Sequence, residues 1–373
     1  MLNYFQPTLL RANHYSEAMD AFFDRLGLTA PIIQAPMAGV QNHQLAAAVC
    51  EAGGLGSLPA AMLGPQALEA ELTALRALTD RPFNVNFFCH TPPKADAARQ
   101  ARWHAALSLY YAQLGLDASA IPSGPGRVPF NAEAAEVLAA FKPAVVSFHF
   151  GLPAPELLAQ VKSWGSLVLS SATTVAEALW LQAHGADAIV AQGLEAGGHR
   201  GMFLSDDLST QMGTFALLPQ VVQAVSVPVV AAGGIANAAG IAAARALGAA
   251  GVQIGTGYLC SQEASTSALH RAALLSEAAQ HTALTNVFTG RPARGIVNRL
   301  MRDLGPISTD APAFPLATAA LAPVRAAAEA QRSSDFTPLW AGQNTSGLRE
   351  ASAAEITHAW AEAWHQAGKE KAA

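Results

Sequence analysis

Cysteine and charge are both scarce in this chain of 373 residues. The three cysteines, Cys50, Cys89 and Cys260, lie far apart without a CxxC spacing, which argues against a disulfide framework or a zinc site and favours a reducing compartment. Only 13% of the residues are charged, while 51% are hydrophobic. Such a chain has to bury a large core, so a disordered or scaffold protein is excluded.

No basic field, secretory signal or long uninterrupted apolar run is visible in the sequence. A net charge of −5 argues against nucleic-acid and anionic-membrane partners. The first 20 residues contain no basic segment followed by an apolar one, and the most apolar stretch, 225–254, is broken by Pro228, Asn237 and Arg245. The sequence therefore predicts a cytoplasmic enzyme that acts on small molecules, with a monomer and a dimer both left open.

Short apolar runs recur along the chain, and each is followed by an alanine-rich helical pattern. The predicted strands begin near Ile32, Gly54, Phe83, Val145, Leu167, Ala188, Val227 and Val252. Eight strands that alternate with helices within about 250 residues predict the α/β class and a TIM (β/α)8 barrel. A doubly wound open sheet is the alternative, because strand order is invisible in the sequence.

The gap between the third and fourth predicted strands is too long for one crossover and predicts an insertion at about 90–130. Past Leu259 the strand signal stops, and 263–334 is mostly helical in pattern, with prolines as punctuation. The predicted organisation is a barrel formed by 1–262 and completed by about 335–373, with 263–334 as a small helical substrate-binding lobe.

Polar residues follow several predicted strands, where the loops of a barrel carry function. These candidates are Gln34, Pro36, Met37, Asn84, Asn86, His149, Gln192, Glu195, Gly197, Gly198 and His199.

Glycine pairs follow the last two strands, at Gly233–Gly234 and at Gly255 before Thr256. Backbone N–H groups would converge there beside a helix start, and this is the usual phosphate site of the fold. Tight turns alone would explain single glycines, but two such turns at the two expected places favour phosphate.

Several segments together resemble the nitronate monooxygenase family, formerly 2-nitropropane dioxygenase, from about 31 to 343. They are QAPMAGV, NVNFF, SFHFG, QGLEAGGHRG, GRPARGIVNRLM and LWAGQ, together with the two glycine turns. QGLEAGGHRG is the most specific piece. LWAGQ and GRPARGIVNR suggest the class I branch. The resemblance implies a TIM barrel that binds FMN, a helical substrate lobe and no metal.

The resemblance also implies residue roles. Met37, Asn86 and Gln192 would line the isoalloxazine ring, beside Pro36. The residues implied for the ribityl chain and phosphate are Gly197, Gly198, Gly233, Gly234, Gln253, Gly255 and Thr256. His199 matches the family's active-site histidine, and His149 matches a second polar residue near the substrate.

The candidate site residues also have purely structural interpretations. His199 could be a loop histidine, although its Gly-Gly neighbours favour catalysis, and His149 could be core packing. Arg291, Arg294 and Asn298 are interpreted first as structural. Trp340 and Gln343 would close the substrate pocket, unless the tryptophan is plain core.

The implied reaction is FMN-dependent oxidation of alkyl nitronates, such as propionate 3-nitronate, by O2. One-electron transfer to the flavin would lead to a carbonyl compound plus nitrite or nitrate, and the implied cellular role is detoxification. His199 would orient the nitronate, or remove the α-proton of a neutral nitroalkane.

Three alternatives remain open. The first is an FMN-dependent NAD(P)H reductase acting on an enoyl thioester or a quinone; no GxGxxG follows a strand and opens a helix, which weighs only mildly against nicotinamide. The second is a flavin-free lyase or aldolase, disfavoured because no lysine lies at a strand end. The third is a non-catalytic flavin- or phosphate-binding module.

Overall fold

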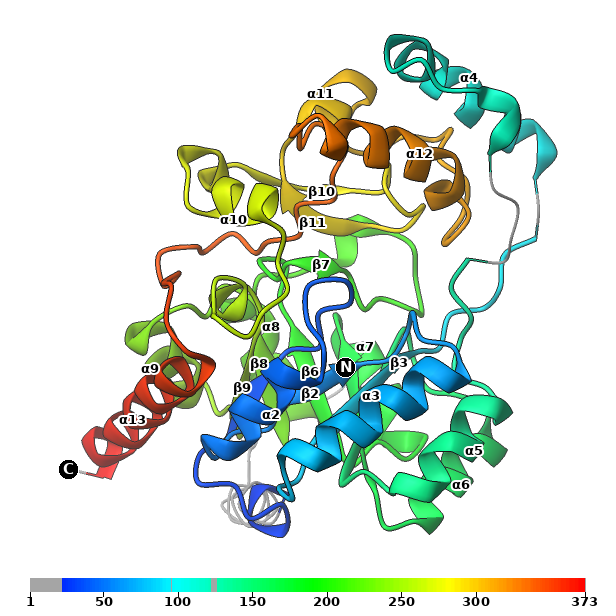
Figure 1. Ribbon diagram of the computed structural model, residues 1–373. Helices are drawn as coiled ribbons and strands as arrows, with labels where there is room; N and C mark the ends of the chain where they lie inside the picture. Colours follow the sequence, from blue (N-terminus) through cyan, green and yellow to red (C-terminus); the bar gives the residue numbers. More distant parts are fainter. Residues whose placement is uncertain (1–21, 95, 122–125, 373) are drawn as a thin grey trace, which may run out of the picture.

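The computed structural model of the protein describes residues 22–94, 96–121 and 126–372. The predicted barrel segment begins at residue 1, so its first 21 positions lie outside the described residues. Figure 1 shows a barrel below a smaller lobe, with α4 at the far end of the lobe.

Eight parallel strands form the barrel. They are β1 (Ile32–Gln34), β2 (Ser57–Pro59), β3 (Asn84–Phe88), β4 (Val145–His149), β5 (Leu167–Ala172), β6 (Ala188–Gln192), β8 (Val229–Ala232) and β9 (Gly251–Ile254). Their order is β1-β9-β8-β6-β5-β4-β3-β2, and a parallel bridge between Ile33 and Leu55 closes the circle. The predicted TIM barrel is confirmed, and the open sheet is excluded.

Helices surround the strands. The outer ring comprises α2 (His43–Glu51), α3 (Pro65–Leu78), α5 (Ala132–Phe141), α6 (Pro155–Ser163), α7 (Val175–Ala183), α8 (Thr214–Ala224), α9 (Ala238–Ala246) and α13 (Ala353–Ala372). Side-chain oxygens of Asn42, Asn131, Thr174 and Asn237 cap four of these helices. Because helices cover the outside and side chains fill the inside, the strands are buried on both faces, which explains their unbroken apolar runs.

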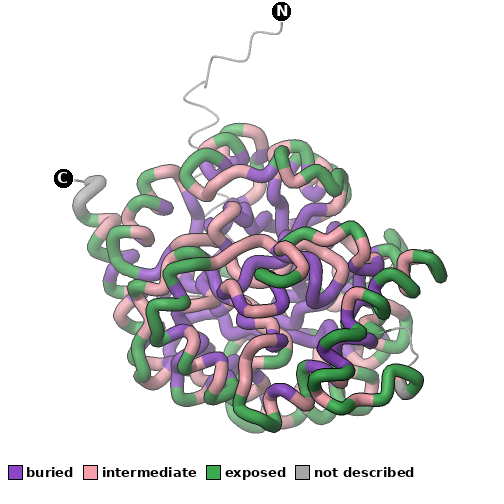
Figure 2. The backbone as a smooth tube through the Cα atoms, turned by 90° about the horizontal axis from the view of Figure 1, so that it is seen from above, coloured by how far each residue is buried: buried purple, intermediate pink, exposed green. Residues whose placement is uncertain are grey.

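The barrel interior is a packed core and not a pore. Ile33, Leu55, Leu169, Val190 and Val230 belong to one buried cluster inside it. Figure 2 shows buried backbone concentrated centrally and exposed backbone mostly around it. The interior below the strand ends is therefore filled, and only the carboxyl ends of the strands are left to form a cavity.

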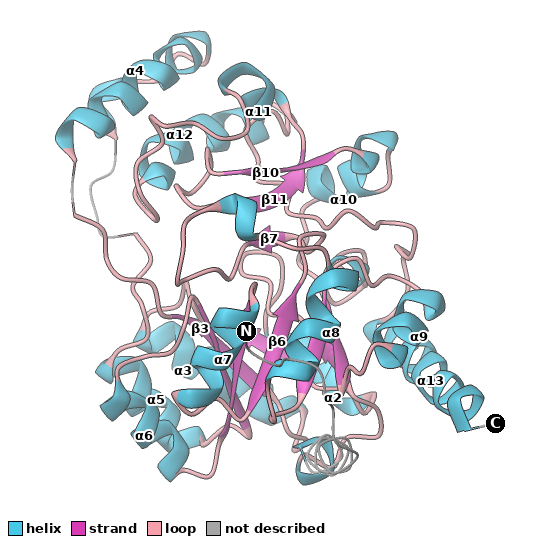
Figure 3. Cartoon of the chain, turned by 180° about the vertical axis from the view of Figure 1, so that it is seen from behind, coloured by secondary structure: helices cyan, strands magenta, loops and turns pink. Residues whose placement is uncertain are grey.

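The lobe contains strands that the sequence pattern did not predict. Alongside α10 (Ala268–Leu274), α11 (Arg299–Leu304) and α12 (Ala317–Ala330), it contains β10 (Thr282–Thr285) and β11 (Ala293–Ile296). These pair antiparallel with each other, and β11 also pairs with β7 (Gly198–His199), which leaves the barrel after β6. Figure 3 shows β7 between the barrel and the lobe strands. The interpretation in which the strand signal stops past Leu259 and 263–334 is mostly helical therefore missed these two short strands.

The segment at 90–130 also reaches the lobe. Its helix α4 (Ala97–Gln113) packs against α12, and Trp103, Leu107 and Tyr111 join a buried cluster with lobe residues such as Phe288. Nε1 of Trp103 donates to the carbonyl of Ala317 at 3.1 Å. At the other end of the chain, α13 packs on α9, α2 and β1.

Candidate active site

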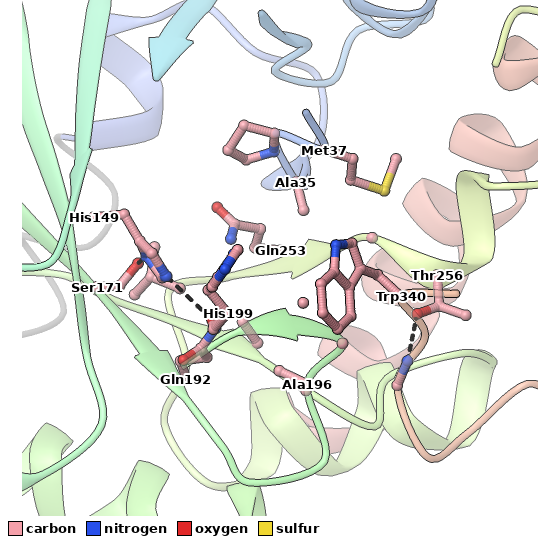
Figure 4. A pocket seen from close by; sticks show the side chains of 18 of the residues that line it. Ala35, Met37, His149, Ser171, Gln192, Ala196, His199, Gln253, Thr256 and Trp340 are labelled. Carbon is pink, nitrogen blue, oxygen red and sulfur yellow. Dashed lines mark hydrogen bonds between the residues drawn. The ribbon is translucent and has the colours of Figure 1, made fainter. Parts of the chain in front are cut away.

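A cavity opens at the carboxyl ends of the barrel strands, beneath the lobe. It holds about 1350 Å³ of empty space, its open mouth included. Figure 4 shows His199, Gln192, Met37, Gln253, Thr256 and Trp340 arranged around this space.

Backbone N–H groups without partners converge on one side of the cavity. No described group accepts a hydrogen bond from the N–H of Gly234, Gly255 or Thr256. Gly234 has φ +71°, a conformation that favours glycine. Together with the start of α9 a few residues later, these free donors have the chemistry that a phosphate site requires.

A segment that follows the lobe closes over this anion site. The N–H of Gly342 donates to Oγ1 of Thr256 at 2.9 Å, which leaves the Thr256 hydroxyl proton free to donate. Nδ2 of Asn344 donates to the carbonyl of Gly234 at 2.9 Å. A Cβ on Gly197 would lie 2.6 Å from the backbone of Ala341 and Gly342, so glycine is required there.

Two amide side chains line the cavity, and each has one polar group without a partner among the described residues. Nδ2 of Asn86 donates to Oγ of Ser147 at 2.9 Å, and no described group donates to Oδ1 of Asn86. Gln192 accepts from the N–H of Gly201 at 2.8 Å and donates to the carbonyl of His199 at 3.0 Å, which uses only one of its two N–H donors. The pair therefore offers one acceptor and one donor to a bound ring.

Met37 is held by a glutamine network underneath it. Oε1 of Gln41 accepts from the N–H of Met37 at 2.9 Å and from Nε2 of Gln34 at 2.6 Å. Gln34, expected at the mouth, is fully buried and instead anchors this loop. Asn84 is likewise buried and donates to Oγ of Ser57 at 3.0 Å, so it does not line the cavity.

His149 is a neutral donor with both ring nitrogens engaged. Nε2 lies 3.1 Å from the carbonyl oxygen of His199, which can only accept, so Nε2 carries the proton. Nδ1 then accepts from the Ser171 hydroxyl at 3.0 Å. Burial lowers the pKa of His149 to about 4, so the ring stays neutral at pH 7.

His199 lies on β7, and its ring meets the lobe. Nε2 is 2.9 Å from Oγ1 of Thr289, whose hydroxyl is directed at the carbonyl of Arg291 at 3.4 Å. With that proton directed away, Nε2–H of His199 donates to Thr289 and Nδ1 keeps a free lone pair. Burial, followed by the charge of Arg127, lowers the pKa of His199 well below 6.5.

Aromatic rings enclose the His199 imidazole. The centroid of its ring lies 6.0 Å from those of Phe88 and Phe150, 5.3 Å from that of Phe314 and 5.7 Å from that of Trp340. Trp340 is held by His270, whose Nε2 donates to its carbonyl at 3.1 Å. This shell keeps water from the imidazole and explains why burial dominates its pKa.

A buried arginine fixes the β6–β7 loop. The side chain of Arg200 is completely buried and donates to the carbonyls of Gln192 and Gly193 at 2.8 and 2.7 Å, and to Gln211 at 3.0 Å. Glu195, a strand-end candidate, does not pair with Arg200; its carboxylate accepts from the N–H and hydroxyl of Thr214. Its contacts are therefore structural.

The cavity gathers nearly all of the predicted site residues. Its lining includes Pro36, Met37, Asn86, His149, Gln192, Gly197, Gly198, His199, Gly233, Gly234, Gln253, Gly255, Thr256 and Trp340. Gln343 is exposed and does not line it; its neighbours Gly342 and Asn344 do. Arg291, Arg294 and Asn298 donate to backbone carbonyls of Met202, Leu194 and Thr337, which agrees with their structural reading.

Sequence reasoning missed several residues of the site. Thr289 and Phe314 come from the lobe, Arg127 from the 90–130 segment, and Ser171 from β5. Ser171 could have been found, because it ends a predicted strand. Nothing local marks the other three residues, which reach His199 only through tertiary packing.

Two further properties bear on the class of the site. Within the described ranges, no three His, Cys, Asp or Glu side chains gather in a way that could hold a metal ion. Among the described helices, none is long and apolar enough to cross a membrane.

Comparison with known proteins identifies relatives of the chain. The family profile described as "Nitronate monooxygenase" matches residues 20–360. The chain is 45% identical over 341 residues to a nitronate monooxygenase of Paraburkholderia phytofirmans, covering 90% of this chain and 92% of that protein. The structure of a nitroalkane oxidase from Streptomyces ansochromogenes matches with a TM-score of 0.85 and 40% identity, covering 94% and 99% of the two chains. FabK from Thermotoga maritima matches with a TM-score of 0.70 and 26% identity, covering 94% and 98%.

Proposed function

The chain belongs to the nitronate monooxygenase family, and we propose that it uses FMN to oxidise alkyl nitronates with O2 to a carbonyl compound plus nitrite or nitrate. One observation carries the proposal: the lining of a single cavity includes both residues with unpaired backbone N–H groups and a half-buried neutral histidine, His199. Detoxification of nitro compounds is the cellular role that this reaction implies.

The residues present suit FMN. The N–H groups of Gly234, Gly255 and Thr256 would hold the phosphate, because these residues line the cavity and no described group accepts from their N–H groups. Met37 offers an apolar surface for the ring, while Asn86 and Gln192 offer an acceptor and a donor for its polar edge. When bound, FMN would supply one-electron oxidation of the substrate.

His199 would act on the substrate with its Nδ1. A neutral nitroalkane has an acidic α-proton, and the free lone pair of Nδ1 is placed to accept it. A nitronate has already lost that proton, so His199 would only help to orient it. The aromatic shell of Phe88, Phe150 and Phe314 would exclude water from the reacting carbon.

Anaerobic mixing of the FMN-loaded enzyme with propionate 3-nitronate tests this proposal. We expect the flavin absorbance to change on mixing, and then nitrite or nitrate to form when O2 is admitted. Ethyl nitronate serves as a second substrate. If neither nitronate changes the flavin absorbance but NADH or NADPH bleaches it rapidly, the result would contradict the proposal and favour the NAD(P)H reductase alternative. A protein that does not retain added FMN would contradict the cofactor assignment itself.

A further inference from the structure

A cation without a counter-ion lies in the wall of the cavity. Arg127 lines the cavity, and its Nη1 is buried without a hydrogen-bond partner among the described residues. Nη2 makes only a long contact, 4.0 Å, with Sδ of Met62. In the described part of the chain, no carboxylate forms an ion pair with Arg127. A half-buried cation of this kind is stabilised when an anion reaches it.

Two contacts hold Arg127 in place, one to its backbone and one to its guanidinium. His90 donates through Nε2 to the carbonyl oxygen of Arg127 at 3.1 Å. The guanidinium carbon lies 5.4 Å from the centroid of the Phe314 ring. The Phe314 ring and the hydrogen-bonded main chain together restrict the positions that the Arg127 guanidinium can adopt.

Phe314 also relates Arg127 to His199. The same ring lies 5.3 Å from the His199 imidazole, centroid to centroid. Both Arg127 and His199 line the same cavity, so one ligand can reach both groups.

Arg291 does not offer the same site. Its guanidinium donates to the carbonyl of Met202 and lies 4.1 Å from the centroid of the Phe150 ring, and it does not line the cavity. Of these two arginines, Arg127 is thus the one that lines the cavity.

We infer that Arg127 binds a second anionic group, a carboxylate, at the far end of the nitronate substrate. The inference rests on the proposed function and adds to it a specificity-determining residue. Guanidinium and carboxylate match in geometry as well as charge, since two parallel N–H donors meet two oxygens. The enzyme is then selective for nitronates that carry an acid group at the end away from the nitronate.

Two substrates of similar shape test the inference. One is propionate 3-nitronate, and the other is 3-methylbutyl nitronate, in which an isopropyl group replaces the carboxylate. For the holoenzyme, the Arg127→Met variant should lower kcat/KM for the acidic substrate about 10- to 100-fold, mainly through KM. The change for the isopropyl substrate should stay below about 3-fold. Arg127→Lys keeps the charge and should recover part of the loss.

Binding without turnover gives an independent readout. Succinate should compete with the acidic nitronate, and its inhibition constant should rise in Arg127→Met by a similar factor. Arg102→Met is the matched control, because Arg102 forms an exposed ion pair with Asp310 outside the cavity.

The outcomes distinguish an error in the role of Arg127 from an error in the proposed function. Equal losses on both substrates, or no loss on either, would overturn the role of Arg127 while leaving the proposed function standing. Failure of the unmodified enzyme to oxidise either nitronate would contradict the proposed function instead.

Discussion

The Nε2–H of His149 donates a hydrogen bond to the main-chain carbonyl of His199 over 3.1 Å, so one histidine positions the other through its backbone. Gln192 donates to the same oxygen at 3.0 Å. Both ring nitrogens of His149, which the resemblance places near the substrate, are thus engaged within the protein, and we propose that His149 positions His199.

Replacing His149 tests that role. His149→Phe removes the donor to His199 and should lower kcat about 10-fold, with a smaller effect on KM, because the orientation of the base is relaxed. His149→Gln can return an N–H near the same place and should recover much of the rate. Steady-state kinetics of both variants provide the measurement. Equal losses in the two variants would show that ring packing, and not the hydrogen bond, matters.

Removing the His199 imidazole should lower the activity on neutral nitroalkanes more than the activity on nitronates. With neutral nitroalkanes, His199→Ala should lose about 10²- to 10⁴-fold in kcat/KM, because no base remains for the α-proton. With the corresponding nitronates the loss should be about 10-fold, since that proton is already absent. Full turnover of nitronates and nitroalkanes by His199→Ala would refute the assignment.

The Thr256 hydroxyl should contribute to phosphate binding. Thr256→Val removes the one O–H of the cradle and should weaken FMN about 10- to 100-fold while leaving riboflavin, which has no phosphate, nearly unchanged. Quenching of flavin fluorescence on titration measures both affinities. Thr266→Val is a matched control, because the buried Thr266 hydroxyl has no described partner and lies outside the cavity. A parallel loss of riboflavin would place the effect elsewhere than at the phosphate.

Buried neutral histidines should make the protein sensitive to acid. Burial lowers the pKa of both His149 and His270 to about 4, from about 6.5 in an unfolded chain. The unfolded state therefore binds more protons below pH 6.5, and the free energy of unfolding should fall as pH drops from 6.5 to 4. Each histidine contributes on the order of 3 kcal/mol to this fall.

Urea unfolding at several pH values measures the effect. His270→Gln keeps a donor for the Trp340 carbonyl but does not titrate, so it should flatten the pH dependence between 6.5 and 4. His184→Gln is a control, because His184 is exposed. An unchanged slope in His270→Gln would mean that this imidazole does not remain neutral in the folded state.

The sequence by itself determined the barrel and most of the lining of its cavity. Strands such as β5 and β6 are buried on both faces, so their apolar runs are visible without any partner. Because the strands of a barrel are parallel, polar residues and glycines at their carboxyl ends, such as Gln192 and Gly234, lie at the same end of the barrel.

Only the tertiary structure decided how the lobe completes the site. β11 is four residues long and exists through its pairing with β10 and β7, which no local pattern encodes. That pairing places Ala293 opposite His199, and the lobe brings Thr289 to its ring. Likewise, Arg127 reaches the cavity and Gln343 turns away from it because of packing between distant segments. Contacts of this kind depend on burial and hydrogen bonding across the fold, and so they leave no periodic signal in the chain.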